Sequence, residues 1–150
     1  MGNILHKDFV DFIDALNKRK VEYIVVGGYS VIFHGYSRTT GDLDIWVNKT
    51  SSNYKKLLEA FNDFGMAIFD MTEENFLSNP NIDVFSFGRP PVSIDIMTNV
   101  KGLEFAESFG QSSIIKVEGL DLRLIDFRDL IQAKKASGRS KDFDDIENLE

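Results

Sequence analysis

The sequence predicts a single α+β domain over residues 1–150, with helices flanking a mixed β-sheet. First, the composition, 43% hydrophobic and 27% charged, is typical of a globular domain. Second, apolar residues recur at helical spacing in some segments and alternate with polar residues in others. Third, strand-like segments occur both singly between helices and in pairs around glycine turns, an order that favours a mixed sheet. No repeat or long linker divides the chain.

In the first half of the chain, predicted helices and strands alternate. Apolar residues spaced three and four apart predict the longer helices, and runs of β-branched and aromatic residues predict the strands. The predicted elements are a helix at 6–20, a strand at 21–26, a short helix at 29–34, a strand at 42–47 and a helix at 51–64. Ser51 or Ser52 is expected to cap the last helix.

Paired strands and then helices are predicted in the second half. Glycine turns between apolar runs indicate the pairs, and an acid before each helical run with a glycine after it indicates helix ends. The predicted elements are strands at 81–87 and 91–97 around Gly88–Pro91, a hairpin at 113–125 turning at Glu118-Gly119, a helix capped by Asp126 and stopped by Gly138, and a final helix from 141.

Composition and charge restrict the function classes. The chain has no cysteine, which excludes thiol nucleophiles and cysteine zinc sites. It has a net charge of −7, which argues against a grip on nucleic acid by the whole surface. No apolar run is long enough to span a membrane, and the first residues lack the pattern of a signal peptide. We therefore expect a cytoplasmic protein without a membrane partner.

Paired acids on the strand at 42–47 are the strongest chemical signal. Asp42 and Asp44 are two residues apart, so their side chains share one face of the strand, about 6.5–7 Å apart at Cα. Carboxylates held this way are typical ligands of Mg²⁺. Asp95, in a strand of the same pattern, would join them if the two strands are neighbours, and Asp83 is the rival third acid. Three such acids predict a site for one or two metal ions.

A glycine turn precedes these acids. Gly27, Gly28 and Ser30 lie between a strand and a short helix, where backbone N–H groups and a hydroxyl are suited to a phosphate. His34 follows and is interpreted as structural, because no orienting acid for a Ser–His pair is evident. Arg38 stands just before the acids and is expected either to pair with them or to hold a phosphate.

Together, the segments Gly27-Gly28-Tyr29-Ser30, His34-Gly35 and Arg38-Thr39-Thr40-Gly41-Asp42-Leu43-Asp44 resemble the nucleotidyltransferase superfamily with the DNA-polymerase-β-type core. More narrowly, they and the ending Leu130-Ile131, Lys134, Gly138-Arg139, Lys141-Asp142 and Asp145-Ile146 are similar to the prokaryotic branch that contains the AbiEii toxins of toxin–antitoxin systems. The resemblance covers residues from about 22 to 150, with a core at about 22–100 and a C-terminal hairpin and helices at about 113–150.

The resemblance implies a nucleotidyltransferase that moves a nucleoside monophosphate from an NTP to an acceptor hydroxyl. It implies a catalytic and metal-binding set, Asp42, Asp44 and Asp95, with two Mg²⁺ ions or Mn²⁺, and a nucleotide-binding set, Gly27, Gly28, Ser30, Arg38, Thr40 and Lys134. The acceptor is RNA, protein or a small molecule, and a cognate toxin or antitoxin is the implied partner.

Lys134 is also singled out by its position. Leu130 and Ile131 precede it by four and three residues, so its helix can pack while directing the lysine along the edge of the packed face. A triphosphate beside three carboxylates requires such a cation. Lys135 is rotated by about 100° and is expected to be free in solvent.

Two other functions remain consistent with the same residues. The first is a non-catalytic nucleotide-binding or partner-binding module of a toxin–antitoxin pair. The second is a metal-dependent nuclease, which three acids could also support, although hydrolysis of nucleic acid does not require a glycine turn suited to a triphosphate.

Overall fold

The computed structural model describes residues 5–89 and 92–150. The first part of the chain forms α1 (Lys7–Lys18), β1 (Tyr23–Val26), α2 (Gly27–Phe33), β2 (Asp42–Val47), α3 (Ser51–Phe64) and α4 (Glu73–Leu77). The second part forms β3 (Val84–Arg89), β4 (Val92–Met97), α5 (Phe105–Gln111), β5 (Ser113–Val117), β6 (Leu120–Leu124), α6 (Phe127–Ser137) and α7 (Ser140–Leu149).

The strands form one mixed sheet in the order β3-β4-β2-β1-β6-β5. β2 runs parallel to β4 and β1 runs parallel to β6, whereas the other neighbours are antiparallel. The α+β fold with a mixed sheet is therefore confirmed, as is the hairpin β5–β6. The condition set for Asp95 is also met, because β2 and β4 are neighbours.

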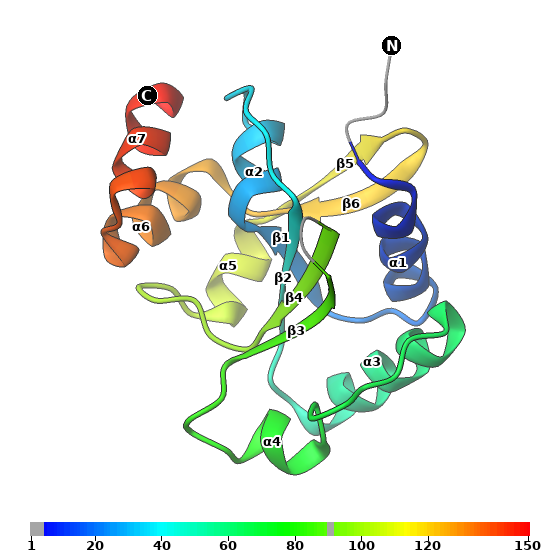
Figure 1. Ribbon diagram of the computed structural model, residues 1–150. Coiled ribbons are helices and arrows are strands. Elements are labelled where there is room, and N and C mark those ends of the chain that lie inside the picture. Colours follow the sequence, from blue (N-terminus) through cyan, green and yellow to red (C-terminus); the bar gives the residue numbers. More distant parts are fainter. Residues whose placement is uncertain (1–4, 90–91) are drawn as a thin grey trace.

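Helices cover both faces of this sheet (Figure 1). On one side α1 and α3 pack together, and Phe12 of α1 meets Phe61 of α3 with ring centroids 5.5 Å apart. On the other side lie α5, α6 and α7, and Trp46 of β2 meets Phe105 of α5 at 5.3 Å. Because side chains alternate along a strand, the buried Leu43, Ile45 and Val47 of β2 face α1 and α3, and Asp42 and Asp44 share the opposite face with Trp46.

Several predicted element ends agree with the structure, but the helix expected at 29–34 is α2 at Gly27–Phe33. The strand expected at 81–87 is β3 at Val84–Arg89, so Gly88 and Arg89 of the expected turn belong to the strand. Asp126 caps α6 by accepting a hydrogen bond from the N–H of Arg128, and Gly138 ends that helix with a positive φ of 68°. The predicted cap of α3 was wrong: Thr50, not Ser51 or Ser52, accepts the hydrogen bond from the N–H of Asn53. Both serines lie inside the helix, since Thr50 is the last residue with extended backbone.

Two short helices, α4 and α5, were not predicted. Each has fewer than eight residues, too few for a helical period to be distinguished from a loop. The expected turn between β3 and β4 falls partly on Pro90 and Pro91, which lie outside the described residues. Within residues 5–89 and 92–150, no helix is both long enough and apolar enough to cross a membrane.

Candidate active site

The two neighbouring strands β2 and β4 place three acids on one face of the sheet. Their parallel register sets Asp44 directly beside Asp95 and Asp42 beside Ser93. The Ser93 hydroxyl donates a 2.6 Å hydrogen bond to Oδ1 of Asp42. Asp42 is exposed, whereas Asp44 and Asp95 are half-buried. The sheet thus brings the three predicted acids together, with Asp42 at the open end.

Asp44 has the most strongly perturbed carboxyl group of the three. Burial, together with the charge and hydrogen-bonding contact of Asp95 and the charge of Asp42, raises its pKa to about 7, against a weak opposing effect of Lys141. Two carboxylates this close repel each other when both are ionised, so the pair favours a shared proton or a bound cation. The pair therefore has an intrinsic requirement for positive charge near neutral pH.

Asp83, the rival third acid, lies elsewhere. Strand β3 begins only at Val84, and the residue of β3 that stands beside Asp95 is Ser86. Asp83 is exposed, and its backbone carbonyl accepts a hydrogen bond from the N–H of Thr98, beyond the end of β4. The structure therefore places Asp95 next to Asp44 and leaves Asp83 out of the cluster.

The glycine turn lies directly over Asp44. Gly27 begins α2 with φ of 68°, and a Cβ there would come within 2.7 Å of Cγ of Asp44. A Cβ on Gly28 would come within 2.9 Å of Cβ of Thr40. Because glycine has no side chain, Asp44 can lie close to Gly27 and Thr40 can lie close to Gly28. Ser30 is fully buried, and its hydroxyl donates a 2.6 Å hydrogen bond to the Gly27 carbonyl. This hydrogen bond stabilises the turn.

A cavity of about 290 Å³ extends from this turn along the α6 side of the sheet. Gly27 and Asp44 lie at one wall, and Lys134 and Arg139 line another. Apolar side chains of β4 and α6 contribute much of the remaining lining, including Met97, Leu130 and Ala133. The cavity therefore offers carboxylates, a glycine turn, cations and an apolar wall to one ligand.

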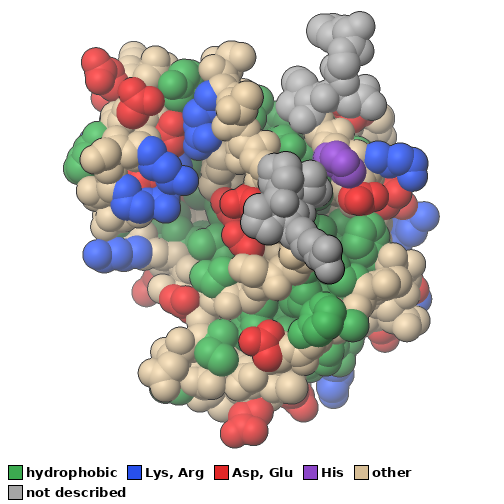
Figure 2. Space-filling model, viewed as in Figure 1, with side chains coloured by type: hydrophobic (Ala, Val, Ile, Leu, Met, Phe, Trp, Pro, Cys, Tyr) green, Lys and Arg blue, Asp and Glu red, His purple; other side chains and the backbone are tan. Residues whose placement is uncertain are grey.

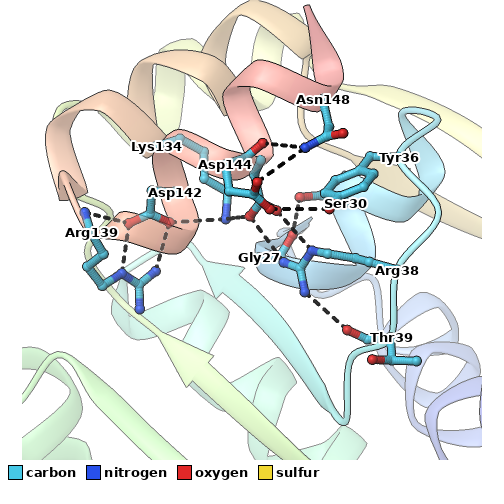
Figure 3. Close-up of polar contacts among 11 residues, drawn as sticks. Gly27, Ser30, Tyr36, Arg38, Thr39, Lys134, Arg139, Asp142, Asp144 and Asn148 are labelled. Carbon is cyan, nitrogen blue, oxygen red and sulfur yellow. Dashed lines mark hydrogen bonds and ion pairs between the residues drawn. The ribbon is translucent and has the colours of Figure 1, made fainter.

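Lys134 lies in a buried ion-pair network with α7. It is 6% exposed, and its Nζ lies 3.3 Å from Oδ1 of Asp142 and 3.1 Å from Oδ2 of Asp145 (Figure 3). Lys135, the next residue, is exposed, as expected from its rotation around the helix. Lys134 lines the same cavity as Asp44, with its charge already partnered.

Arg38 belongs to the same network rather than pairing with the nearby acids of β2. Its Nε lies 3.0 Å from Oδ1 of Asp145, and its Nη2 donates to Oδ2 at 3.2 Å. Its Nη1 donates to the carbonyl of Thr39, and the neighbouring Tyr36 donates to Asp144 of α7 (Figure 3). Of the two roles expected for Arg38, pairing with Asp42 or Asp44 was therefore wrong.

Asp142 is the most strongly stabilised acid of this network. Burial alone would raise its pKa, but hydrogen bonds from Arg139 and the charge of Lys134 hold the pKa well below its usual range. Arg139 donates from Nε at 2.7 Å and from its backbone N–H at 3.1 Å. Asp142 therefore remains ionised at neutral pH.

In the space-filling view, basic side chains gather where α6 and α7 lie, beside acidic side chains near the centre (Figure 2).

His34 has the structural role that was predicted. Its Nε2 lies 2.7 Å from the carbonyl oxygen of Ile125, and its ring packs against Phe127. It joins the end of α2 to the segment before α6, and it makes no contact with Ser30 that would activate a nucleophile.

The carboxylates fit a metal ion through their chemistry, without forming a closed cage. Among the described residues, no three His, Cys, Asp or Glu side chains converge closely enough to hold a metal by themselves. Asp44 and Asp95 nevertheless form an oxygen-only pair with an unmet need for positive charge, and Mg²⁺ is commonly held by one or two carboxylates plus substrate phosphates. The donor set therefore suits an ion that arrives with a phosphate ligand.

The burial of Asp142 and Asp145 could not be read from the sequence. In the sequence both entered only as part of the C-terminal motif similar to the AbiEii branch, yet they are 0% and 2% exposed. Their spacing of three residues, with Ile146 on the same side of the helix, was a signal of a packed face. Their partners became evident only when α7 was seen against α6 and Arg38.

Solved structures of similar fold include several nucleotidyltransferases. The lincosamide antibiotic adenylyltransferase LnuA, with lincomycin bound, is 18% identical, has a TM-score of 0.61, and is matched over 98% of its chain and 99% of this one. TM1012 of Thermotoga maritima, described as a candidate nucleotidyltransferase, is 14% identical and has a TM-score of 0.58. The match covers 86% of its chain and 91% of this one. An antigenic nucleotidyltransferase-like protein of Paracoccidioides brasiliensis is 14% identical and has a TM-score of 0.53. The match covers 77% of its chain and 97% of this one. These likenesses show the fold.

Comparison with curated proteins found no significant match. A family profile, however, matches residues 7–150, nearly the whole chain, and so includes the acids of β2 and β4, the glycine turn and the network of α6 and α7. The chain belongs to the family described as nucleotidyltransferase of unknown function (DUF6036).

Proposed function

We propose that the protein transfers a nucleoside monophosphate from an NTP to an acceptor hydroxyl with the aid of Mg²⁺, so that the new phosphoester bond replaces the α–β phosphoanhydride bond and pyrophosphate leaves. The observation that carries the proposal is the half-buried pair of Asp44 and Asp95 beneath the Gly27 turn, of which Asp44 lines a cavity that Lys134 and Arg139 also line. Family membership and the adenylyltransferase fold support the reaction class.

Different residues would have different roles in such a transfer. The turn at Gly27 and Gly28 would offer backbone N–H groups to phosphate oxygens. The missing side chains of these glycines also let Asp44 and Thr40 lie close against the turn. Asp95, which lies beside Asp44, would accept the proton of the attacking hydroxyl. The apolar wall formed by Met97, Leu130 and Ala133 suits a nucleoside and excludes water from it.

Asp42, Asp44 and Asp95 would hold the metal, as one or two ions. Mg²⁺ or Mn²⁺ bound there supplies positive charge to the phosphates and lowers the pKa of a coordinated hydroxyl. Arg38, Lys134 and Arg139 carry further positive charge on the α6 and α7 side. Their partners on α7 fix the positions of these three cations before a nucleotide enters.

The acceptor and the biological setting are part of the proposal. RNA, protein and small molecules are all candidate acceptors, and small molecules come first in the test because LnuA, which has the same fold and nearly the same length, is an antibiotic adenylyltransferase. A role in a cytoplasmic toxin–antitoxin pair follows from the sequence resemblance to the AbiEii branch and is tested by co-purification with the product of the adjacent gene.

A second candidate is a nucleotide-binding module without turnover. The pairing of Arg38 and Lys134 with Asp145 favours it, because both cations would have to share their carboxylate with a phosphate. This candidate predicts NTP binding without any release of pyrophosphate.

The decisive test is incubation of the protein with each α-labelled NTP, Mg²⁺ and candidate acceptors, including cell lysate. We expect transfer of label by the wild type and by Asp83→Asn, and its loss in Asp95→Asn with NTP binding largely kept. Asp83 is the matched control because it is an acid near β3 outside the cluster. Exchange of the two phenotypes would contradict the assignment of the third acid, and binding without transfer in every case would favour the second candidate.

A further inference from the structure

A row of residues crosses the sheet from the glycine turn to the edge strand β3. Val26, the residue before Gly27, stands beside Asp44, and Asp44 stands beside Asp95. On the far side of Asp95, the next residue in the row is Ser86 of β3. The row therefore has the glycine turn at one end, the two acids in the middle and a serine at the other end.

Ser86 lies on the same face of the sheet as Asp95. Residues directly opposite each other in an antiparallel pair share a face, with their Cβ atoms about 4.5–5.5 Å apart. The strand neighbours of Ser86, Phe85 and Phe87, are buried on the other face, where Phe87 meets Phe61 of α3 with ring centroids 4.9 Å apart. The Ser86 hydroxyl and the Asp95 carboxylate are therefore neighbours on the face that carries the candidate active site.

The hydroxyl of Ser86 is free to react. Ser86 is exposed, and in the described part of the chain its side chain has no hydrogen-bond partner. The two other serines near the acids are already bonded, since Ser93 donates to Asp42 and the buried Ser30 donates to the carbonyl of Gly27. Of these three hydroxyls, that of Ser86 alone is both accessible and uncommitted.

The order of the row matches the direction of an in-line transfer. In such a transfer the attacking oxygen and the leaving oxygen lie on opposite sides of the phosphorus. With the triphosphate at the Gly27 turn, as the proposed function requires, the attacking hydroxyl has to approach from the β3 side of Asp95. Ser86 occupies that side.

We propose that the protein transfers a nucleoside monophosphate to the hydroxyl of its own Ser86, a self-modification that rests on the proposed nucleotidyl transfer. The Oγ of Ser86 forms a bond to the α-phosphorus of the NTP, the bond from this phosphorus to the oxygen that bridges to the β-phosphate breaks, and pyrophosphate leaves. The hydroxyl proton goes to the carboxylate of Asp95 on the neighbouring strand. The product is a nucleotide joined to the edge strand by a phosphodiester.

The structure favours a reaction within one chain. Strands β3 and β4 are paired along their whole length, from Val84 beside Met97 to Arg89 beside Val92, so Ser86 and Asp95 are held together before any nucleotide enters. A hydroxyl fixed next to the group that takes its proton needs no encounter between two molecules. The labelled fraction should therefore not depend on protein concentration.

Incubation of the purified protein with each α-labelled NTP and Mg²⁺, without any other acceptor, tests the proposal. We expect label on the protein, at most one nucleotide per chain, and peptide mass spectrometry should place it on Ser86. Ser86→Ala should lose the label and still bind the NTP in calorimetry, which shows that the variant is folded. Ser86→Thr, which keeps a hydroxyl on the strand, should be labelled at the same position.

Two controls locate the reaction. Ser113→Ala is the matched control, because Ser113 is an exposed serine of β5, the strand at the other edge of the sheet, and this variant should be labelled as the wild type is. A mixture of Ser86→Ala with Asp95→Asn should stay unlabelled, because neither chain has both the serine and the proton acceptor. Label on another residue, label that survives in Ser86→Ala, or label in the mixture would overturn the proposal.

Addition of candidate acceptors to the same incubation separates self-modification from the proposed function. If an acceptor becomes labelled and pyrophosphate is released while the protein stays unlabelled with and without acceptor, modification of Ser86 is wrong and the nucleotidyl transfer stands. If neither the protein nor any acceptor is labelled, both are overturned.

Discussion

Replacement of Asp44 by Asn should stabilise the metal-free protein at alkaline pH. Burial and the neighbouring carboxylates raise the pKa of Asp44 from 3.8 to about 7. The folded protein therefore binds this proton more tightly than the unfolded chain does. Its contribution to stability is complete below pH 3.8 and is lost as the pH rises through 7.

The size of the effect follows from the shift in pKa. Each pKa unit corresponds to about 1.4 kcal/mol, so a shift carried by Asp44 alone would cost about 4 kcal/mol at pH 8. Asp44 lies directly against a second carboxylate and solvent reaches part of the site, so we expect a smaller difference of about 1–2 kcal/mol. Asn keeps the shape of the side chain without the charge and should recover that amount.

Chemical denaturation at several pH values between 3.5 and 8, with a chelator present, measures this difference. We expect Asp44→Asn and the wild type to have similar free energies of unfolding at pH 3.5, and the advantage of the variant to grow as the pH rises to 8. Asp83→Asn controls for the loss of one negative charge from an exposed position. A variant less stable than the wild type at pH 8 would refute the reasoning, because Asp44 would then be stabilised in its ionised form.

Three other substitutions test the surrounding structure. Gly27→Ala should lower the free energy of unfolding more than Gly119→Ala in denaturant melts, because both have positive φ but only the first added Cβ would overlap Asp44. Lys134→Ala should destabilise the protein by about 2–3 kcal/mol and weaken NTP binding in calorimetry, whereas Lys135→Ala should change neither, since only Lys134 is buried between carboxylates. Thr50→Ala should cost about 1 kcal/mol in the same melts through loss of the α3 cap.

The chemistry of β2 was predictable because it depends on local geometry. Alternation along a strand puts Asp42 and Asp44 on one face whatever the rest of the chain does. Their partner was not determined locally: Asp83 and Asp95 have similar sequence surroundings, and only the strand register shows which one meets Asp44. Register is set by packing of whole strands, which a single sequence does not display.

Among the expected nucleotide-binding residues too, local features were predictable from the sequence and contacts between distant segments were not. The turn at Gly27 was evident from two glycines after a strand, but the inward hydrogen bond of Ser30 was not. Arg38 was expected near acids, and it does meet one, although Asp145 lies 107 residues away in the sequence. Contacts of that separation depend on how α7 docks, and no spacing rule predicts them.

Thermal melts with Mg²⁺, an NTP, both or neither test the central claim, that the carboxylate pair and the adjoining cavity form one metal–nucleotide site. Because a ligand that binds only the folded state raises stability by mass action, saturating Mg²⁺ and NTP together should raise the Tm by several degrees, more than the sum of their separate effects. The same mixture should leave the Tm of Asp44→Asn nearly unchanged. A full shift in Asp44→Asn would contradict the account, because the nucleotide and metal would then bind somewhere else.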